Sequence, residues 1–345
     1  MAMRFGRLVI AAAVGAALAS GPAGGVLAQD APFYKDKTIR FIISAGVAGG
    51  YVSYARLLAE HMGRHIPGNP SFIVQSMPGA GGLLATNYLY TQAPQDGTTI
   101  GLIHSTVPLA PLFGMAGARF DPMKIHWLGS MDRSDGPCTA WHTSPIKTWA
   151  DMLDKEFIVG SSGVGSQMEL YPVVMNKLFG TKVKVIGGYK DGASIFYAME
   201  NGEIHGRCGP QLTSIGSLRP QWLTEKKIAV PIVVSERRTP QFPDAPTLLE
   251  LAKDEPTRQQ IRLLIVSQDL DRPVLAPPGV PAERVKLLRD AFNATMADPA
   301  FLADIKKQRL TLDWVRGEEV TSTLAAAYSM PPDVVSAAKA MMVGK

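Results

Sequence analysis

The sequence repeats one local design, in which a short apolar run ends in a glycine-containing loop and a helical pattern follows at once. The clearest example is the β-branched run Thr38–Ser44, which leads through the loop Ala48–Gly50 into a helical pattern at Tyr51–His65. Short apolar runs bounded by glycine predict strands. Because the order is β-α-β-α-β with short connections, we expect a doubly wound α/β fold with largely parallel sheets.

The design continues along the chain. Pro231 lies inside one of the apolar runs and predicts an edge strand or a bulge there. The helix near 282–296 is expected to begin after Pro281 and to end before Asp298. Further strands are predicted at 72–76, near 98–104, twice within 125–144, and at 157–161, 183–186, 202–209, 228–236 and 273–281. Further helices are predicted at 83–91, 168–179, 195–201, 282–296 and 299–308. One more is expected to begin behind Ser144-Pro145, and another to follow the proline-rich connection 241–252.

The first residues have the layout of a secretory signal peptide. Met1–Ala28 has two arginines, Arg4 and Arg7, then an apolar stretch, and ends in small residues. A membrane anchor is the alternative, but the apolar stretch is shorter than the roughly 20 residues that a span needs. We therefore expect cleavage near Ala28 and a soluble periplasmic protein. Residues 29–345 have 33 basic and 30 acidic side chains, without a basic block typical of nucleic-acid binding.

The two cysteines, Cys138 and Cys208, do not predict a metal site, because neither lies in a C-x-x-C pair or at ligand spacing from a histidine. An exported protein can form a disulfide, but two buried thiols remain equally open. No G-x-S-x-G or H-E-x-x-H motif is present. We therefore expect no enzyme activity, no cofactor and no metal, with a hydrolase-like enzyme as the alternative.

Four glycine-containing loops share one chemical property. The first residues of a helix carry backbone N–H groups without internal partners, and the helix dipole adds about half a positive charge there. In a doubly wound sheet such loops gather at the carboxyl ends of the strands. The loops Ala48–Gly50, Pro78–Gly82, Gly163–Gln167 and Tyr189–Ser194 therefore predict a carboxylate site built mainly from main-chain amides, although any single loop is also compatible with a plain turn.

Several segments resemble those of a known family. "SAGVAGGYVSYARLLAEHM", "MPGAGG", "GSSGVGSQ" and "LAPPGVP" are similar, in this order, to landmark segments of the Bug family, the periplasmic solute receptors of tripartite tricarboxylate transporters. The resemblance covers residues 33 to about 320. It implies a type II periplasmic-binding-protein fold, with two doubly wound α/β lobes joined by hinge strands around a ligand cleft.

The resemblance also implies a division of labour along the chain. We expect a signal peptide at 1–28, a first lobe at 29–128 plus 231–345, and a second lobe at 129–230. The expected partners are a small organic carboxylate and the membrane permease subunits of the transporter, with no nucleic acid and a monomeric chain. A receptor that signals to a membrane sensor is the alternative, since it would use the same cleft.

The ligand class follows from a departure from the family. Family members often carry in the first loop an aspartate that can meet an amino group, and "SAGVAGGYVS" contains none. We therefore expect a di- or tricarboxylate or an aromatic acid rather than an amino acid. Tyr51 offers a ring face or a hydroxyl, whereas His104 and Arg207 are open to a structural or a ligand-facing role. The candidate ligand-binding residues are Ala48, Gly49, Gly50, Tyr51, Ser53, Pro78, Gly79, Ala80, Gly81, Gly82, His104, Ser105, Thr106, Ser162, Gly165, Ser166, Gln167, Tyr189, Gly192, Ala193, Ser194 and Arg207.

Overall fold

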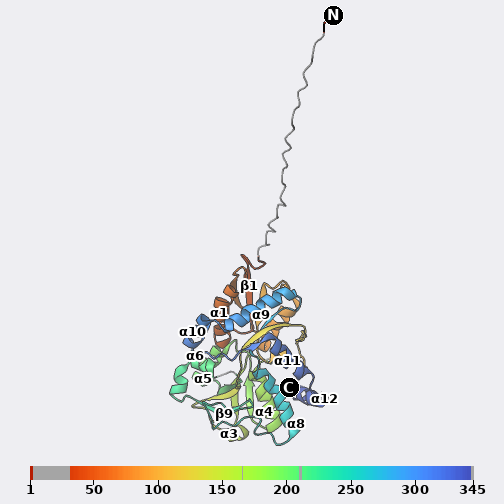
Figure 1. The fold of residues 1–345 in the computed structure, drawn as a ribbon. Helices are drawn as coiled ribbons and strands as arrows, with labels where there is room; N and C mark the ends of the chain where they lie inside the picture. The colour runs from red at the N-terminus through yellow and green to blue at the C-terminus, as the bar shows by residue number, and fades with distance from the viewer. Residues whose placement is uncertain (3–31, 165, 210–211, 343–345) are drawn as a thin grey trace. The chain divides into compact units, whose positions relative to one another are not determined.

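A computed structural model describes residues 1–2, 32–164, 166–209 and 212–342 (Figure 1). The predicted signal peptide lies almost entirely outside the described residues. Residues 32–345 group into one unit that holds two sheets. In the part of the chain that is described, no helix is both long and apolar enough to cross a membrane.

Six described strands form the first sheet, in the order β11-β4-β10-β3-β1-β2. Strand β1 pairs in parallel with β2 and β3, whereas β10 runs antiparallel to β3 and β4, and β11 antiparallel to β4. The prediction of a largely parallel sheet is therefore wrong for this half, because no βαβ crossover sets the direction of β4, β10 or β11. The bounds are β1 Thr38–Ile43, β2 Ser71–Ser76, β3 Thr99–Leu102, β4 His126–Asp132, β10 Asp271–Ala276 and β11 Val315–Arg316.

The second sheet is also mixed, with the order β7-β6-β8-β5-β9 among the described strands. Strand β6 is parallel to β7 and β8, and β5 is antiparallel to β8 and β9. Strand β9 contains Pro231 and lies at the sheet edge, which confirms the edge position predicted from that proline. The bounds are β5 Pro137–Trp141, β6 Phe157–Gly160, β7 Val183–Ile186, β8 Gly206–Cys208 and β9 Ile228–Val233.

The helices beside the first sheet follow the predicted pattern. In α1 the apolar residues Tyr54, Ala55, Leu58 and Met62 recur at three- and four-residue steps and are buried. This face packs against α9 and α10, so the amphipathic spacing determines which side of the helix is covered. The bounds are α1 Gly50–Met62, α2 Leu83–Thr91, α9 Ala282–Met296 and α10 Pro299–Lys307, with single 3-10 turns at Gly63–His65, Ala80–Gly82, Val107–Leu109 and Val266–Gln268.

Helix caps explain where several predicted starts were misplaced. Helix α3 begins after Thr148 instead of behind Ser144-Pro145, because Thr148 and Asp151 form a capping box. The helix expected directly after 241–252 begins only at Glu255, where Asp254 caps α8. Helices α11 and α12 were not predicted. The bounds are α3 Trp149–Asp154, α4 Gln167–Phe179, α5 Gly192–Glu200, α6 Thr213–Leu218, α7 Pro220–Thr224, α8 Glu255–Ile265, α11 Gly317–Tyr328 and α12 Pro332–Met342.

The chain enters the second sheet after β4 and leaves it after β9. The expected lobe boundaries, at 128/129 and 230/231, fall inside these two strands. Helix α12, expected with the first lobe, packs against α4 and α8 (Figure 1), and the Lys177 ammonium donates to the carbonyl oxygen of Ala340 at 3.0 Å. The exact division of the chain into lobes remains a prediction.

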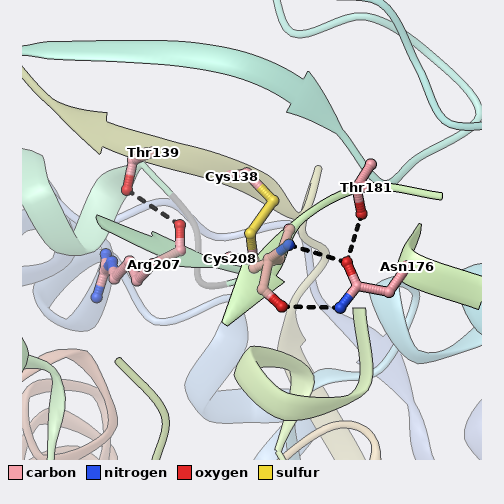
Figure 2. Close-up of a disulfide and its surroundings, with 7 residues drawn as sticks. Cys138, Thr139, Asn176, Thr181, Arg207 and Cys208 are labelled. Carbon is pink, nitrogen blue, oxygen red and sulfur yellow. Dashed lines mark hydrogen bonds between the residues drawn. A yellow bond between two sulfur atoms is a disulfide. The ribbon is translucent and has the colours of Figure 1, made fainter. Parts of the chain in front are cut away.

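A disulfide crosses the second sheet. Cys138 on β5 lies directly opposite Cys208 on β8, and the structure joins them (Figure 2). The choice between a disulfide and two buried thiols is thus resolved in favour of the disulfide. Arg207 precedes Cys208 in β8, and its carbonyl oxygen accepts a hydrogen bond from the Thr139 hydroxyl at 3.5 Å. The disulfide therefore ties down the strand that carries Arg207.

Candidate functional site

A cavity lies where loops that follow strands of both sheets meet. Its volume is about 50 Å³, and on a comparable measure one water needs about 10–15 Å³. In this arrangement it therefore holds a group of a few non-hydrogen atoms, such as a carboxylate. Its walls combine backbone of helix starts with two buried arginines. The lining residues are Ala45, Ala48, Gly50, Tyr51, His104, Ser162, Ser166, Gln167, Met168, Lys190, Asp191, Gly192, Arg207, Ser214, Leu218 and Arg272.

Hydrogen bonds around the cavity connect the loops of one sheet with those of the other. The Gly46 amide donates to the carbonyl oxygen of Lys190 at 2.9 Å, and the Gly81 amide donates to that of Ser162 at 3.2 Å. The Gln167 side-chain amide donates to the Ser105 hydroxyl at 2.6 Å. These contacts join the first-sheet loops after β1, β2 and β3 to the second-sheet loops after β6 and β7. These hydrogen bonds bridge the two sides of the cavity.

Two long helices start at this cavity without a side-chain cap. Helix α1 follows Gly49, whose φ of 97° is in the range that favours glycine, and no side chain caps it. Gly50 lies close to Arg272, since a Cβ there would be 3.2 Å from a guanidinium nitrogen. At α4, the Ser166 hydroxyl donates to the carbonyl oxygen of Gly163 at 2.7 Å instead of capping the helix. Among the described residues, no side chain accepts from the first N–H groups of either helix, and these helix starts favour an anion.

The start of α5 differs from the other two. Asp191 caps it, and its carboxylate accepts from the Ser194 amide at 2.9 Å. The Asp191 amide donates to the Ser194 hydroxyl oxygen at 3.4 Å, which completes the capping box. This helix start already has its own anion. A ligand carboxylate therefore binds more favourably at the starts of α1 and α4 than at the start of α5.

Arg207 brings a buried positive charge to the cavity without an ion pair among the described residues. Its side chain is 1% exposed, donates to the Ser214 hydroxyl at 2.6 Å and lies over the Phe196 ring at 4.3 Å. Its Nε atom is buried and has no hydrogen-bond partner in the part of the chain that is described. Burial, together with the nearby charge of Arg272, lowers the pKa of Arg207 to about 9. It is still a cation at neutral pH, and an anion in the cavity would stabilise it.

Arg272 is the second buried cation and differs from Arg207 by having a partner. It is 2% exposed and forms an ion pair with Asp271 at 2.5 Å. Its guanidinium lies 4.2 Å from the centre of the Tyr51 ring and 5.1 Å from that of Tyr54. Burial raises the pKa of Asp271 to about 6, although Arg272 opposes the shift. One oxygen of Asp271 and the Nε atom of Arg272 are buried without a hydrogen-bond partner among the described residues.

His104 lines the cavity as a neutral imidazole. Its Nδ1 lies 2.7 Å from the carbonyl oxygen of Gly81, and since a carbonyl only accepts, Nδ1 carries the hydrogen. Burial lowers the pKa of His104 to about 4. The imidazole packs edge-on against Tyr51, with ring centres 4.7 Å apart. In this tautomer the remaining nitrogen, Nε2, has a lone pair and no hydrogen.

A second cluster of acidic and imidazole groups does not argue for a metal. Glu60, His61 and Asp304 offer atoms within 4.8 Å of one another. However, His61 Nε2 lies 3.0 Å from Asp304, and Nδ1 is in contact with the Arg64 guanidinium. Both imidazole nitrogens are thus engaged, and a guanidinium lies where a cation would have to approach. Within the described residues the cluster is best explained as a hydrogen-bond network that links α1 to α10.

The comparisons with known proteins agree with this geometry. Residues 54–324 match the family model for the tripartite tricarboxylate transporter family receptor, TctC. The chain belongs to this family of solute-binding receptors. A protein of Cupriavidus necator, the UPF0065 protein in gbd 5'region, is 25% identical to this receptor over 284 residues, which cover 79% of each chain. The resemblance to the Bug family is confirmed.

Solved structures extend the likeness to the fold. The periplasmic binding protein BugD is 20% identical to this receptor, with a TM-score of 0.70 over 90% of the receptor and 100% of BugD. MatC from Rhodopseudomonas palustris, solved with bound malate, is 17% identical, with a TM-score of 0.66 over 89% of the receptor and 99% of MatC. A third, from R. palustris and solved with adipate, has a TM-score of 0.66 at 17% identity, over 88% and 97%. The predicted type II periplasmic-binding-protein fold is confirmed.

The structure distributes the predicted site residues of this receptor between the cavity and its surroundings. Gly165 lies outside the described residues. Those that line the cavity are Ala48, Gly50, Tyr51, His104, Ser162, Ser166, Gln167, Gly192 and Arg207. Those that do not are Gly49, Ser53, Pro78, Gly79, Ala80, Gly81, Gly82, Ser105, Thr106, Tyr189, Ala193 and Ser194. Of these, Gly81, Ser105 and Ser194 form the hydrogen bonds to lining residues described above.

Sequence reasoning missed several lining residues of the receptor, of which Arg272 is the most consequential. The sequence feature that could have identified it is an Asp-Arg pair at the start of an apolar strand, because charged side chains are rarely buried without a functional or structural partner. The predicted strand began at Pro273 and left the pair outside. Ser214 and Leu218 come from α6, a short helix that was not predicted. The missed lining residues are Ala45, Met168, Lys190, Asp191, Ser214, Leu218 and Arg272.

Proposed function

We propose that this protein is a periplasmic solute receptor that captures a small organic dicarboxylate in the cavity between its two sheets and delivers it to a tripartite tricarboxylate-type permease. The observation that carries the proposal is Arg207, a buried cation without an ion pair among the described residues. A buried charge is costly unless it is paired. A ligand carboxylate supplies the missing partner, and the charge-assisted hydrogen bonds that result are the strong ones.

A second group of donors favours a ligand with two anionic ends. Arg272 is paired with Asp271, but its Nε atom is buried without a hydrogen-bond partner among the described residues. The Ser162 hydroxyl is buried without a partner among the described residues. The uncapped starts of α1 and α4 add dipoles of the same sign. Two guanidinium groups at one small cavity suit a dianion better than a single carboxylate, and no carboxylate of the first loop is present to hold an ammonium group.

Binding on this proposal is coupled to closure. The three hydrogen bonds between loops of the two sheets hold the cavity shut, so a ligand enters only when they break. Hinge closure around a ligand is the usual motion of periplasmic binding proteins. We place the hinge in the crossings after β4 and β9. A ligand of four to six carbon atoms would then be enclosed as the loops separate slightly and re-form around it.

The remaining parts of the proposal follow from the family. A receptor of a tripartite transporter functions outside the cytoplasmic membrane, as a soluble protein released by its signal peptide, and hands its ligand to permease subunits. We propose a monomer that binds without turnover and needs no cofactor. Uptake of radiolabelled ligand into vesicles that hold the permease tests delivery. Uptake that is independent of added receptor would argue instead for a sensory role.

Thermal-shift and calorimetric titration of the purified protein test the ligand class. The panel holds succinate, malate and adipate as dianions, benzoate as an aromatic monoanion, glutamate as an amino acid and succinamide as the neutral isostere of succinate. We expect dianions to bind and succinamide to be silent. At about 100 times Kd a ligand stabilises the protein by about 2.7 kcal/mol. A response to glutamate alone, or to none of the panel, would refute the proposed ligand class.

A further inference from the structure

The structure assigns to His104 the recognition of a hydroxyl group on the ligand, so that the receptor prefers a hydroxy-dicarboxylate to the same acid without the hydroxyl. This inference rests on the proposed function, because it needs a dicarboxylate in the cavity. It adds a specificity-determining residue that the charge argument does not provide.

The hydrogen on the imidazole is placed by the hydrogen bond to Gly81. A carbonyl oxygen cannot donate, so Nδ1–H must be the donor of the 2.7 Å contact. The nearby charge of Arg272 opposes a second proton on the imidazole. The charged groups at this cavity are Arg207, Arg272, Lys190 and Asp191, with Asp271 behind Arg272. Three of these five are cations, so the balance of charge keeps the imidazole neutral.

A neutral imidazole in this tautomer presents an acceptor to the cavity. The Nε2 lone pair repels a carboxylate oxygen, which is also only an acceptor. It accepts a hydrogen bond from a hydroxyl. Among the described residues no side chain donates to Nε2: the ring contacts the carbonyl oxygen of Gly81 through Nδ1 and packs edge-on against Tyr51. A ligand donor is therefore the complementary group.

The Tyr51 ring relates this acceptor to the anion site. The centre of the Tyr51 ring lies 4.7 Å from the centre of the His104 imidazole. The Arg272 guanidinium lies 4.2 Å from the same Tyr51 ring centre. A ligand carboxylate near Arg272 therefore has His104 as a near neighbour across one aromatic ring. A hydroxyl on the carbon next to that carboxylate is the ligand group best placed to reach Nε2.

Paired titrations of L-malate, D-malate and succinate measure the preference. We expect the wild type to bind one malate enantiomer at least tenfold more tightly than succinate, since a site built to pair a hydroxyl discriminates against ligands that lack it. Equal affinities for all three acids would overturn the inference and leave the proposed function intact. Failure of all dianions to bind would instead refute the proposed function.

Two variants separate the acceptor from the fold. In His104→Asn the side-chain amide can still donate to Gly81, but no atom replaces Nε2; we expect the ratio of malate affinity to succinate affinity to fall to about one. In His104→Gln the carbonyl oxygen replaces the Nε2 acceptor, and the preference should persist in part. If His104→Asn still prefers malate to succinate, another residue must recognise the hydroxyl, which would overturn the inference.

Proton linkage provides an independent readout. Calorimetry of malate binding at pH 7 in buffers of different ionisation enthalpy reports any proton taken up. We expect none, because the imidazole stays neutral and accepts from the ligand. Uptake of about one proton that disappears in His104→Asn would show an imidazolium donating to a carboxylate, which would overturn the inference.

Discussion

The two buried arginines provide the sharpest test, because removing their charges should change stability in opposite directions. Burial lowers the pKa of Arg207 to about 9, far below that of an exposed arginine. Each factor of ten in protonation corresponds to about 1.4 kcal/mol, so the fold holds this cation roughly 5 kcal/mol less favourably than water does. The folded pKa lies below the unfolded one, so this cost is fully present below about pH 9 and is relieved only as the pH rises above it.

Arg207→Met should therefore stabilise the unliganded protein. The variant loses the hydrogen bond to Ser214, which contributes about 1.5–3 kcal/mol. A net gain of roughly 2–3 kcal/mol in the free energy of unfolding remains, and a chain of this length should gain about 3–4 °C in Tm. At the same time succinate should no longer raise the Tm, because the cation that needs the ligand has been removed. A lower Tm together with unchanged succinate affinity would refute the reasoning.

Arg272→Met is the matched variant with the opposite expectation. It leaves Asp271 buried without its cation, and breaking a buried pair in this way costs about 3–5 kcal/mol. The pKa of Asp271 is already raised to about 6 with the arginine present and should rise further without it. Since a raised folded pKa gives stability that is lost as the pH rises through it, this variant should recover at pH 5 relative to pH 8. Thermal melts across pH, with Arg272→Met/Asp271→Asn as the rescue, check both statements.

Three further predictions concern closure and the frame of the site. A Cβ at position 46 would lie 2.5 Å from the Asp191 carboxylate, so Gly46→Val should hold the loops apart. We expect succinate affinity to fall at least tenfold while the circular-dichroism spectrum stays unchanged. Unaltered affinity would argue against closure. Replacing Cys138 and Cys208 by alanine opens a loop of 70 residues and should lower the free energy of unfolding, measured in urea melts, by about 4 kcal/mol. It should also weaken ligand binding, because Arg207 lies on β8 beside Cys208. Gly206→Ala should unfold the protein or lower its Tm by more than 10 °C, as a Cβ there would lie 2.1 Å from a backbone oxygen of β5; a wild-type melt would show that β8 can shift.

Much of the local structure was determined by the sequence itself. The strands β1, β2 and β7 and the helices α1, α2, α9 and α10 lie within a residue or two of their predicted bounds, apart from the 3-10 turn that ends α1. In these segments apolar spacing, glycine and proline act over a few residues, and that is the range at which such rules work. The cap at Thr148 could have been predicted from the Thr-x-x-Asp spacing, but the Ser144-Pro145 pair earlier in the chain gives a competing start signal. The family resemblance was readable for the same reason, since its landmarks are short loops.

Tertiary structure alone decided which charges meet. Arg207 was a candidate of uncertain role and Arg272 none at all, because the two lie 65 positions apart and no local pattern connects them. The fold makes them neighbours by placing β8 and β10 at the same cavity, although they belong to different sheets. The disulfide depended likewise on the register of β5 against β8, which places Cys138 opposite Cys208. Local propensity decides how a segment folds, whereas desolvation and pairing of charge depend on what the rest of the chain brings beside it.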